Sequence, residues 1–345
     1  MHEAVIVIAD VYRLSDEPPG GLAAEPGALA GLEYAGRFGE RERLEAGWRE
    51  WLVRWLGRGD LAGVSVAAVA GAATGTEAAT RWIATPVELV AGLTRVHLDR
   101  RGIVRLTAEE QAVLADAFHQ TFAGSGAALQ PLSDGQFLAL TPGIAAVATA
   151  EPARCAGGLL VVPQGAAAAP LLRLIAEIEM WLHGAALNEA RLKRGAAPVT
   201  ALWLWGAMGT ALPHGRSPPP EPANGARHGA TAVFGSDAFV AGLLSLDGRA
   251  MQTLPQRPEA VFADVCAERA VVVVELAGEL PGEEWSLPAA AAALDRRLIQ
   301  PALAALRDGS LKRLTLIAND TRIALGRRSG LKRWRRPRSG LEALA

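Results

Sequence analysis

Two aspartates follow apolar stretches that are typical of buried strands, and their carboxylates are the first candidates for chemistry. Asp10 comes directly after residues 4–9, and Asp320 lies just past residues 311–318. Because parallel strands end at the same edge of a sheet, these two carboxylates could approach one another and hold a metal ion or a substrate hydroxyl. An Asp at a strand end is more often a helix cap or a turn residue. Both interpretations stay open.

A second group of candidates flanks a predicted strand over residues 200–205. Asn188 and Arg191 would open the turn that leads into this strand, and Gly206 and Gly209 follow its end. Ligand sites in open α/β sheets form where strands end in glycine-bearing loops. The functional interpretation is an anion-binding turn, with guanidinium and backbone amide donors. The alternative is a packed connection in which Arg191 is a structural cation.

Several familiar catalytic patterns are missing from the sequence. The six histidines show neither H-x-x-x-H nor H-E-x-x-H spacing, and none follows His228. There is no G-x-S-x-G motif. Residues 71–75 lack the lysine of a phosphate-binding loop. Two cysteines are too few for a disulfide scaffold or a thiolate metal cage, so we expect Cys155 and Cys266 to be buried, inert thiols.

Composition and charge exclude further classes. The chain has 345 residues and a net charge of −1, which argues against a general nucleic-acid binder. One uncharged stretch of 18 residues, 155–172, is interrupted by Pro163, Pro170 and glycines, so we expect no membrane span. The apolar residues 4–9 are too few for a signal peptide. We therefore expect a cytoplasmic protein.

The neutral average conceals an uneven distribution. Residues 311–345 carry a net charge of +8, which leaves −9 for residues 1–310. The basic run 327–338 could bind nucleic acid or an acidic partner, with Trp334 stacking. More often such a tail is a solvated face.

Apolar runs alternate with amphipathic helical patterns, which predicts an α/β fold with a mostly parallel sheet flanked by helices. The predicted buried strands are residues 4–9, 64–70, 200–205, 270–276 and 311–318, and the predicted helices are residues 42–56, a helix beginning at Pro170, and residues 288–307.

The middle of the chain reads as a small α+β insert. We predict short strands at residues 96–97, 103–106, 136–140, 145–150 and 159–162. A helix over residues 107–123 would begin with a capping box, in which Thr107 and Glu110 bond each other's backbone amides. The predicted domains are thus a discontinuous core, residues 1–80 and 164–345, and an inserted domain, residues 81–163.

One segment resembles a known family. Residues 180–206 are similar to the N-x-x-R-x-x-x-G-x-x-P-x-x-x-x-W-x-W-G segment of the RpfE-type regulatory proteins, with Asn188, Arg191 and Gly206 at matching positions. These proteins are bacterial relatives of the archaeal type of cofactor-independent phosphoglycerate mutase, within the alkaline phosphatase superfamily. Weaker similarity lies in residues 82–93, 105–110, 334–337 and 341–344.

The resemblance implies an alkaline-phosphatase-like core with a small inserted domain. In the active mutases, metal-binding carboxylates and histidines surround a serine nucleophile. By position, Asp10 and Asp320 would match two of the metal-binding aspartates, and residues 271–284 would match a stretch that bears further Asp and His ligands.

This chain departs from that pattern. Residues 271–284 contain no Asp or His, and Thr321 replaces the His that should follow Asp320. Ser65, Thr74 and Thr76 are poor candidates for the nucleophile. Thr200 stands in place of an Asn, and Ala185-Ala186 replaces a His-Pro pair.

We therefore expect a degenerate phosphoglycerate-mutase-like protein without mutase activity and without an assigned metal site. It would act as a regulatory or ligand-sensing protein whose ligand is a phosphorylated small molecule. One alternative is an active, metal-dependent mutase or phosphohydrolase with a rearranged site that uses Mn²⁺ or Mg²⁺. A second alternative is an interaction module that uses its basic C-terminus.

Overall fold

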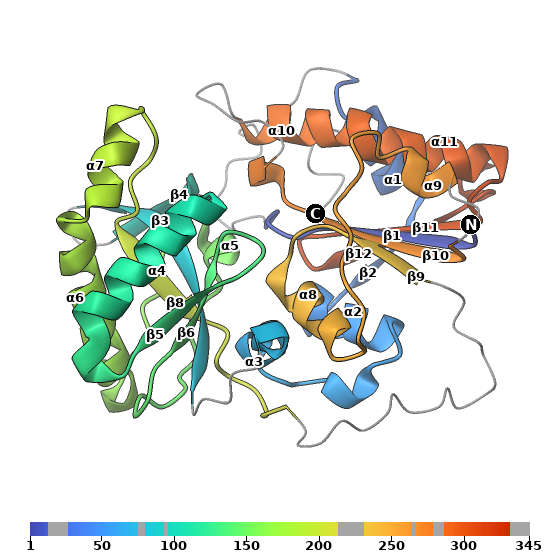
Figure 1. The fold of residues 1–345 in the computed structure, drawn as a ribbon. Coiled ribbons are helices and arrows are strands. Elements are labelled where there is room, and N and C mark those ends of the chain that lie inside the picture. The colour runs from blue at the N-terminus through green and yellow to red at the C-terminus, as the bar shows by residue number, and fades with distance from the viewer. Residues whose placement is uncertain are drawn as a thin grey trace. The chain divides into compact units, whose positions relative to one another are not determined.

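The computed structural model describes residues 1–12, 27–74, 80–92, 96–212, 231–263, 267–278 and 286–331. The chain divides into two compact units, each with its own sheet (Figure 1). The first unit comprises Met1–Gly59, Pro218–Ser236 and Met251–Ala345, and the second comprises Asp60–Ser217 and Asp237–Ala250.

The first unit is built on a six-stranded sheet with the order β2-β12-β11-β1-β10-β9. Its strands are β1 (Glu3–Ile8), β2 (Glu40–Arg43), β9 (Thr231–Phe234), β10 (Arg269–Val274), β11 (Arg313–Ala318) and β12 (Thr321–Gly326). β1 pairs in parallel with both β10 and β11, and β9 continues the parallel part. β12 and β2 add an antiparallel edge. The central strand is almost entirely apolar because both of its faces are covered.

Helices cover both faces of this sheet (Figure 1). They are α1 (Ala30–Phe38), α2 (Gly47–Trp55), α9 (Ala260–Ala263), α10 (Leu287–Leu294) and α11 (Gln300–Asp308). A π-helical turn, Asp295–Ile299, joins α10 to α11. Ala4, Ile6 and Ile8 share a hydrophobic core with α1, α10 and α11. Strand side chains alternate between the two faces of a sheet, and Arg269 of β10 points to the face opposite this core. Helix α2 packs on that face, where the guanidinium carbon of Arg269 lies 3.5 Å from the centre of the Trp55 ring.

The second unit contains an antiparallel sheet with the order β5-β6-β3-β4-β7, and β8 pairs with β3. Its strands are β3 (Arg81–Ala91), β4 (Val96–Ile103), β5 (Ala128–Pro131), β6 (Phe137–Leu140), β7 (Gly158–Leu159) and β8 (Ala201–Trp205). Its helices are α3 (Val66–Ala70), α4 (Ala108–Phe122), α5 (Pro152–Cys155), α6 (Ala169–His183), α7 (Ala186–Lys193) and α8 (Ala238–Ser245). One core joins Trp82 and Phe137 of the sheet to Phe118 of α4 and Ile178 of α6.

The predicted α/β class, with a mostly parallel sheet flanked by helices and a separate α+β unit, is confirmed. The capping box of α4 is also confirmed: the Glu110 N–H donates to the Thr107 hydroxyl at 3.2 Å, and the Thr107 N–H donates to Glu110 Oε2 at 3.0 Å. The helix beginning at Pro170 is α6, and the pattern over residues 288–307 covers α10, the π turn and α11.

One predicted strand is wrong. Most of the predicted strand 64–70 is helix α3, Val66–Ala70, whose N-cap is Ser65: the Ser65 hydroxyl accepts the Ala68 N–H at 3.2 Å. A short apolar run fits a buried strand and a buried helix equally well by periodicity. The serine before the run was the available signal for a helix start.

The compact units divide the chain differently from the predicted domains. Residues 60–80 and 164–217, which we assigned to the core, belong to the second unit. The reason is the pairing of β8, which runs antiparallel to β3 with Ala84 opposite Leu204. An apolar strand does not reveal its partner, because strand pairing depends on contacts between residues far apart in the sequence.

Smaller differences concern single elements. Residues 96–103 form one strand rather than two short ones, residues 145–150 form no strand, and the helix predicted from residue 42 begins at Gly47. The strands β2, β3, β5, β9 and β12 were not predicted. Among the described residues, no helix is both long and apolar enough to cross a membrane. Thr76, Cys266 and the greater part of the basic run 327–338, from residue 332 onward, lie outside the described residues.

Candidate functional site

Asp10 lies where β1 ends, at the edge predicted from the sequence. The strands β1 and β11 are parallel neighbours, so their carboxyl ends do meet at one edge of the sheet. Asp10 Oδ1 accepts the Leu276 N–H at 2.7 Å, and Oδ2 accepts the Ala277 N–H at 2.8 Å. Both amides belong to a short 3₁₀ helix, Leu276–Gly278, that follows β10. Asp10 therefore caps this turn.

Asp320 lies in the tight turn between β11 and β12, where it has a positive φ of 50°. Its Oδ1 accepts the Trp48 N–H at 3.2 Å, and its carbonyl accepts the Leu44 N–H at 2.7 Å. Trp48 lies in the first turn of α2, whose own N-cap residue, Ala46, supplies no side-chain hydrogen bond. A carboxylate at a helix N-terminus satisfies an amide that otherwise lacks a partner. Asp320 thus attaches α2 to the sheet.

The potential metal-binding side chains among the described residues do not fit the two-metal site that the resemblance implies. No group of three His, Cys, Asp or Glu side chains within the described ranges could hold a metal ion. Asp10 bonds the turn after β10, on one side of β1, whereas Asp320 bonds the start of α2. The two aspartates share an edge of the sheet, but their hydrogen bonds hold different segments.

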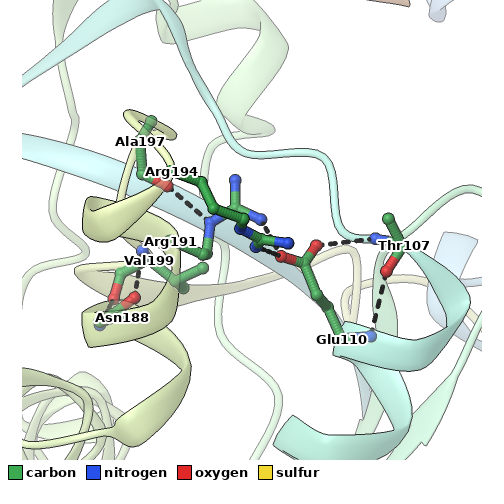
Figure 2. Close-up of polar contacts among 7 residues, drawn as sticks. All are labelled: Thr107, Glu110, Asn188, Arg191, Arg194, Ala197 and Val199. Atoms are coloured by element: carbon green, nitrogen blue, oxygen red, sulfur yellow. Dashed lines mark hydrogen bonds and ion pairs between the residues drawn. The ribbon is translucent and has the colours of Figure 1, made fainter.

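Asn188 joins three parts of the second unit. Its Nδ2 donates to the Leu182 carbonyl at 2.8 Å. Nδ2 also donates to the Val199 carbonyl, and Oδ1 accepts the Val199 N–H, both at 2.8 Å (Figure 2). Asn188 is buried on α7, Leu182 lies near the end of α6, and Val199 precedes β8. The side chain therefore closes the connection between these elements with all of its bonds made to backbone groups.

Arg191 and Glu110 form a buried ion pair (Figure 2). Arg191 Nη1 contacts Glu110 Oε1 at 2.7 Å, and both side chains are at most 10% exposed. Arg191 Nε also donates to the Ala197 carbonyl at 2.7 Å. Arg194, whose side chain is 59% exposed, reaches the same Glu110 oxygen at 2.6 Å. The Glu110 carboxylate thus contacts two guanidinium groups, and that of Arg194 is exposed to solvent.

The charge state of Glu110 follows from these contacts. Burial by itself would raise the pKa of Glu110. The hydrogen bond from the Thr107 N–H and the two guanidinium groups outweigh it and hold the pKa below its ordinary value. Glu110 is therefore the ionised centre that joins α4 to α7.

Gly206 and Gly209 follow β8 and pack against the segment that leads into α3. Gly206 has φ +76°, and its carbonyl accepts the Ala67 N–H at 3.0 Å and the Ser65 hydroxyl at 2.9 Å. Gly209 has φ +134°, and a Cβ added there would lie 2.5 Å from the Ser65 nitrogen. Gly209 therefore permits a close contact between two backbone segments, and Gly206 joins the same two segments through the hydrogen bonds of its carbonyl.

The six predicted site residues are divided between the two units. Asp10 and Asp320 belong to the first unit, whereas Asn188, Arg191, Gly206 and Gly209 belong to the second. Within the second unit, Asn188 bonds Val199, ahead of β8, and Gly206 follows β8. A strand advances about 3.3 Å per residue, so the two pairs lie at opposite ends of β8.

Sequence reasoning missed a buried polar chain in the second unit. The Trp205 indole N–H donates to the Thr85 hydroxyl at 2.8 Å, and Thr85 bonds Gln136. Gln136 Nε2 donates to Asp134 Oδ2 at 2.8 Å, which also accepts the Ala238 N–H at the start of α8. The turn sequence Ser133-Asp134-Gly135 was a signal for a turn, but nothing local indicated its partner in α8.

Asp295 is the other missed residue. It is fully buried in the π turn of the first unit and accepts the Gly31 N–H at 3.0 Å and the Leu32 N–H at 2.7 Å. Gln300 Nε2 donates to it at 2.8 Å. Burial raises the pKa of Asp295, and these hydrogen bonds oppose the rise. Asp295 therefore caps α1 from a distant segment.

Replacing Gly209 by alanine is expected to lower the free energy of unfolding by about 2–4 kcal/mol, because the Cβ meets backbone atoms and the φ disfavours a side chain. Urea unfolding of the full chain measures the change. Gly184→Ala is the matched control, since a Cβ there meets nothing within 4 Å. Equal stability of the two variants would contradict the close approach of Gly209 to Ser65.

Comparisons with known proteins add little to this description. No family model matches the chain, and no curated protein matches it. A solved structure of the PH0037 protein from Pyrococcus horikoshii aligns over 94% of this chain and 87% of its own, with 13% identity and a TM-score of 0.45. A cofactor-independent phosphoglycerate mutase from Thermoplasma acidophilum aligns over 94% and 89%, with 16% identity and a TM-score of 0.35. At these values the alignments carry no argument about activity, and the α/β class rests on the sheet topology of the chain itself.

Proposed function

We propose that this α/β protein is a non-catalytic relative of the phosphoglycerate mutases that binds a phosphorylated small molecule and acts in regulation. The observation that carries the proposal is the hydrogen bonding of the Asp10 carboxylate. Both of its carboxylate oxygens accept backbone N–H groups of the turn after β10. A carboxylate bonded in this way stabilises the fold at the place where the resemblance expects a metal ligand.

The other groups expected in the catalytic centre have comparable structural roles. Asp320 bonds the first turn of α2. Ser65 is buried, and its hydroxyl accepts the Ala68 N–H and donates to the Gly206 carbonyl. A serine nucleophile needs a base or a metal ion that activates its hydroxyl, and here the Ser65 hydroxyl donates its proton to the Gly206 carbonyl oxygen.

Turnover assays test the non-catalytic part of the proposal. The purified chain is incubated with 3-phosphoglycerate and with a generic phosphate ester, in Mn²⁺, Mg²⁺ or Zn²⁺. We expect no turnover above that of a control that contains the substrate and the metal ion but no protein. Turnover that disappears in both Asp10→Asn and Asp320→Asn, while circular dichroism shows that these variants fold, would refute the proposal. Metal analysis of the untreated protein is a second readout, in which a stoichiometric ion would count against it.

The ligand-binding part assigns the anion contact to Arg194. Among the residues around Glu110, Arg194 is the cation with an exposed side chain, and the Arg191–Glu110 pair behind it fixes its position. Guanidinium groups bind phosphate through paired, charge-assisted hydrogen bonds. The buried Asn188 and Arg191 would then support the site, and the ligand would approach from the Arg194 side.

Arg194→Gln is expected to weaken binding of a phosphorylated metabolite about tenfold, the scale of one charge-assisted contact. Calorimetric titration with 3-phosphoglycerate and with inorganic phosphate measures the change. Lys193→Gln is the control, because Lys193 is an exposed neighbour with the same charge. Equal affinities of both variants, or no binding by the parent chain, would exclude Arg194 as the anion contact.

A further inference from the structure

Exposed apolar side chains gather at one end of the sheet of the second unit, and they have no role in the proposed function. They are Leu159 of the end strand β7, Val161 and Val162 after it, Val96 of β4 and Val90 of β3, and each is between 37% and 64% exposed. β4 pairs with β7 and with β3, so these residues belong to three neighbouring strands and the segment after β7. We call the five residues the apolar edge. Single exposed apolar side chains are ordinary on a protein surface, but a group on adjoining strands indicates an interaction surface.

Among the described residues, β7 is paired with another strand on one side only. Leu159 lies opposite His97 of β4, and the Leu160 N–H donates to the Val96 carbonyl at 3.2 Å. Consecutive residues of an antiparallel pair direct their backbone groups to alternate sides of the strand. Because Leu160 bonds β4, the N–H and C=O groups of Leu159 point away from β4, where no described strand pairs with them. β7 therefore offers an open edge to another strand.

The side chains on the solvent face of the apolar edge form a row across the strands. Val90 lies opposite His97, and His97 lies opposite Leu159. Residues that pair directly share a face of the sheet, and Val161 continues on the same face as Leu159. Leu160, between them, points into the core of the second unit. A strand added beside β7 would cover the outer end of this row.

The strand β2, at one end of the other sheet, has an edge that resists pairing with its own copy. Its sequence is Glu40-Arg41-Glu42-Arg43, so the two acids share one face of the sheet and the two arginines share the other. A two-fold axis in an antiparallel pair places residues of the same face opposite one another. Two copies of β2 would therefore bring like charges together, which destabilises the pair.

The other end strands are protected in different ways. β5 ends at Pro131, which has no N–H to donate. β9 is bridged by Gln252, which donates to the Val233 carbonyl at 2.8 Å and accepts the Gly235 N–H at 3.0 Å. β8, which pairs with β3, is buried throughout. Among the described strands, β7 thus combines an open edge with exposed apolar side chains and no charge.

We infer that a second copy of this chain binds the open edge of β7, as an antiparallel strand related to the first by a two-fold axis at Leu159. The two Leu159 residues then exchange both backbone hydrogen bonds, which uses the groups that point away from β4. In this register Leu160 lies opposite Gly158 of the second copy, and Val161 lies opposite Gly157. Each larger side chain thus has a glycine opposite it.

The partner is a second copy because the segment around β7 is complementary to itself. Residues 155–163 contain no charged side chain, so the two-fold axis brings no like charges together, in contrast to β2. The pairing also continues the apolar row of one copy into that of the other, and removal of this apolar area from water favours association.

Light scattering coupled to size-exclusion chromatography tests the inference on the full chain. We expect the mass of a dimer, which dissociates on dilution. Leu159→Lys should weaken the dimer by about tenfold or more, because it places two ammonium groups opposite one another at the axis. Leu192→Lys is the control, since Leu192 is 61% exposed on α7 of the same unit, and this variant should dimerise like the parent chain.

A mixing experiment tests the position of the axis. Leu159→Glu by itself should weaken the dimer as Leu159→Lys does, whereas an equal mixture of the two variants should form dimers, because opposite charges then meet. Circular dichroism establishes that each variant is folded. A monomeric parent chain would overturn the inference, as would a dimer that Leu159→Lys leaves intact or a mixture that stays monomeric.

Discussion

Glu110→Ala is expected to lower the stability of the second unit by about 3–5 kcal/mol, because it leaves the buried Arg191 guanidinium without its counter-ion. It also removes the carboxylate half of the capping box of α4. The loss should appear in urea unfolding, and as faster hydrogen exchange in α7 and the segment before β8. Glu109→Ala is the control, since Glu109 is the exposed neighbour in the same helical turn.

The same pair predicts a pH dependence. The folded-state pKa of Glu110 lies below its ordinary value of 4.5, so its contribution to stability is fully present above about pH 4.5. The contribution is lost as the pH falls through the lowered folded-state value. Glu110→Gln, which cannot ionise, should therefore differ most from the parent at neutral pH, and the difference should shrink in acid. A difference that stays constant down to pH 3 would show that the charge on Glu110 is not what stabilises this contact.

Asp295→Ala is expected to destabilise the first unit by about 2–4 kcal/mol. The change removes the acceptor of the Gly31 and Leu32 N–H groups, both of which are buried, and an unsatisfied buried donor costs about 1–3 kcal/mol. It also leaves a cavity at a fully buried position. The predicted consequence is an earlier urea transition with fraying of α1, measured by hydrogen exchange.

Two further variants sharpen this result. Asp295→Asn keeps one acceptor oxygen but turns an amide N–H₂ toward a backbone donor, so we expect it to be less stable than the parent chain as well. Asp116→Ala is the control for loss of an exposed acid. If Asp295→Asn is as stable as the parent, the amide finds another acceptor and the capping role of Asp295 is wrong.

The sequence predicted those helices and strands whose start or pattern depends on neighbouring residues. The capping box at Thr107 and Glu110 is complete within four residues, and it begins α4 as predicted. The central strand β1 could be identified because a strand covered on both faces is apolar throughout. Even the capping role of the two edge aspartates was one of the interpretations open from the sequence, since backbone amides at turns commonly bond Asp.

The site depended on contacts that no local pattern specifies. Arg191 is close to Asn188 in the sequence, but its counter-ion is Glu110, 81 residues earlier. Gly209 needs its missing Cβ because of Ser65, 144 residues before it, and nothing around Gly209 indicates that neighbour.

The sequence by itself determined the α/β class, the start of α4 at its capping box, and the concentration of positive charge in residues 311–345. Each of these depends on a residue's own type and its near neighbours. Only the tertiary structure decided that residues 200–205 belong to the antiparallel sheet, that Asn188 and Arg191 bond backbone and Glu110, and that Asp10 and Asp320 hold separate turns. Hydrogen bonds and ion pairs between distant segments exist only once packing has brought those segments together, so their partners cannot be read from spacing along the chain.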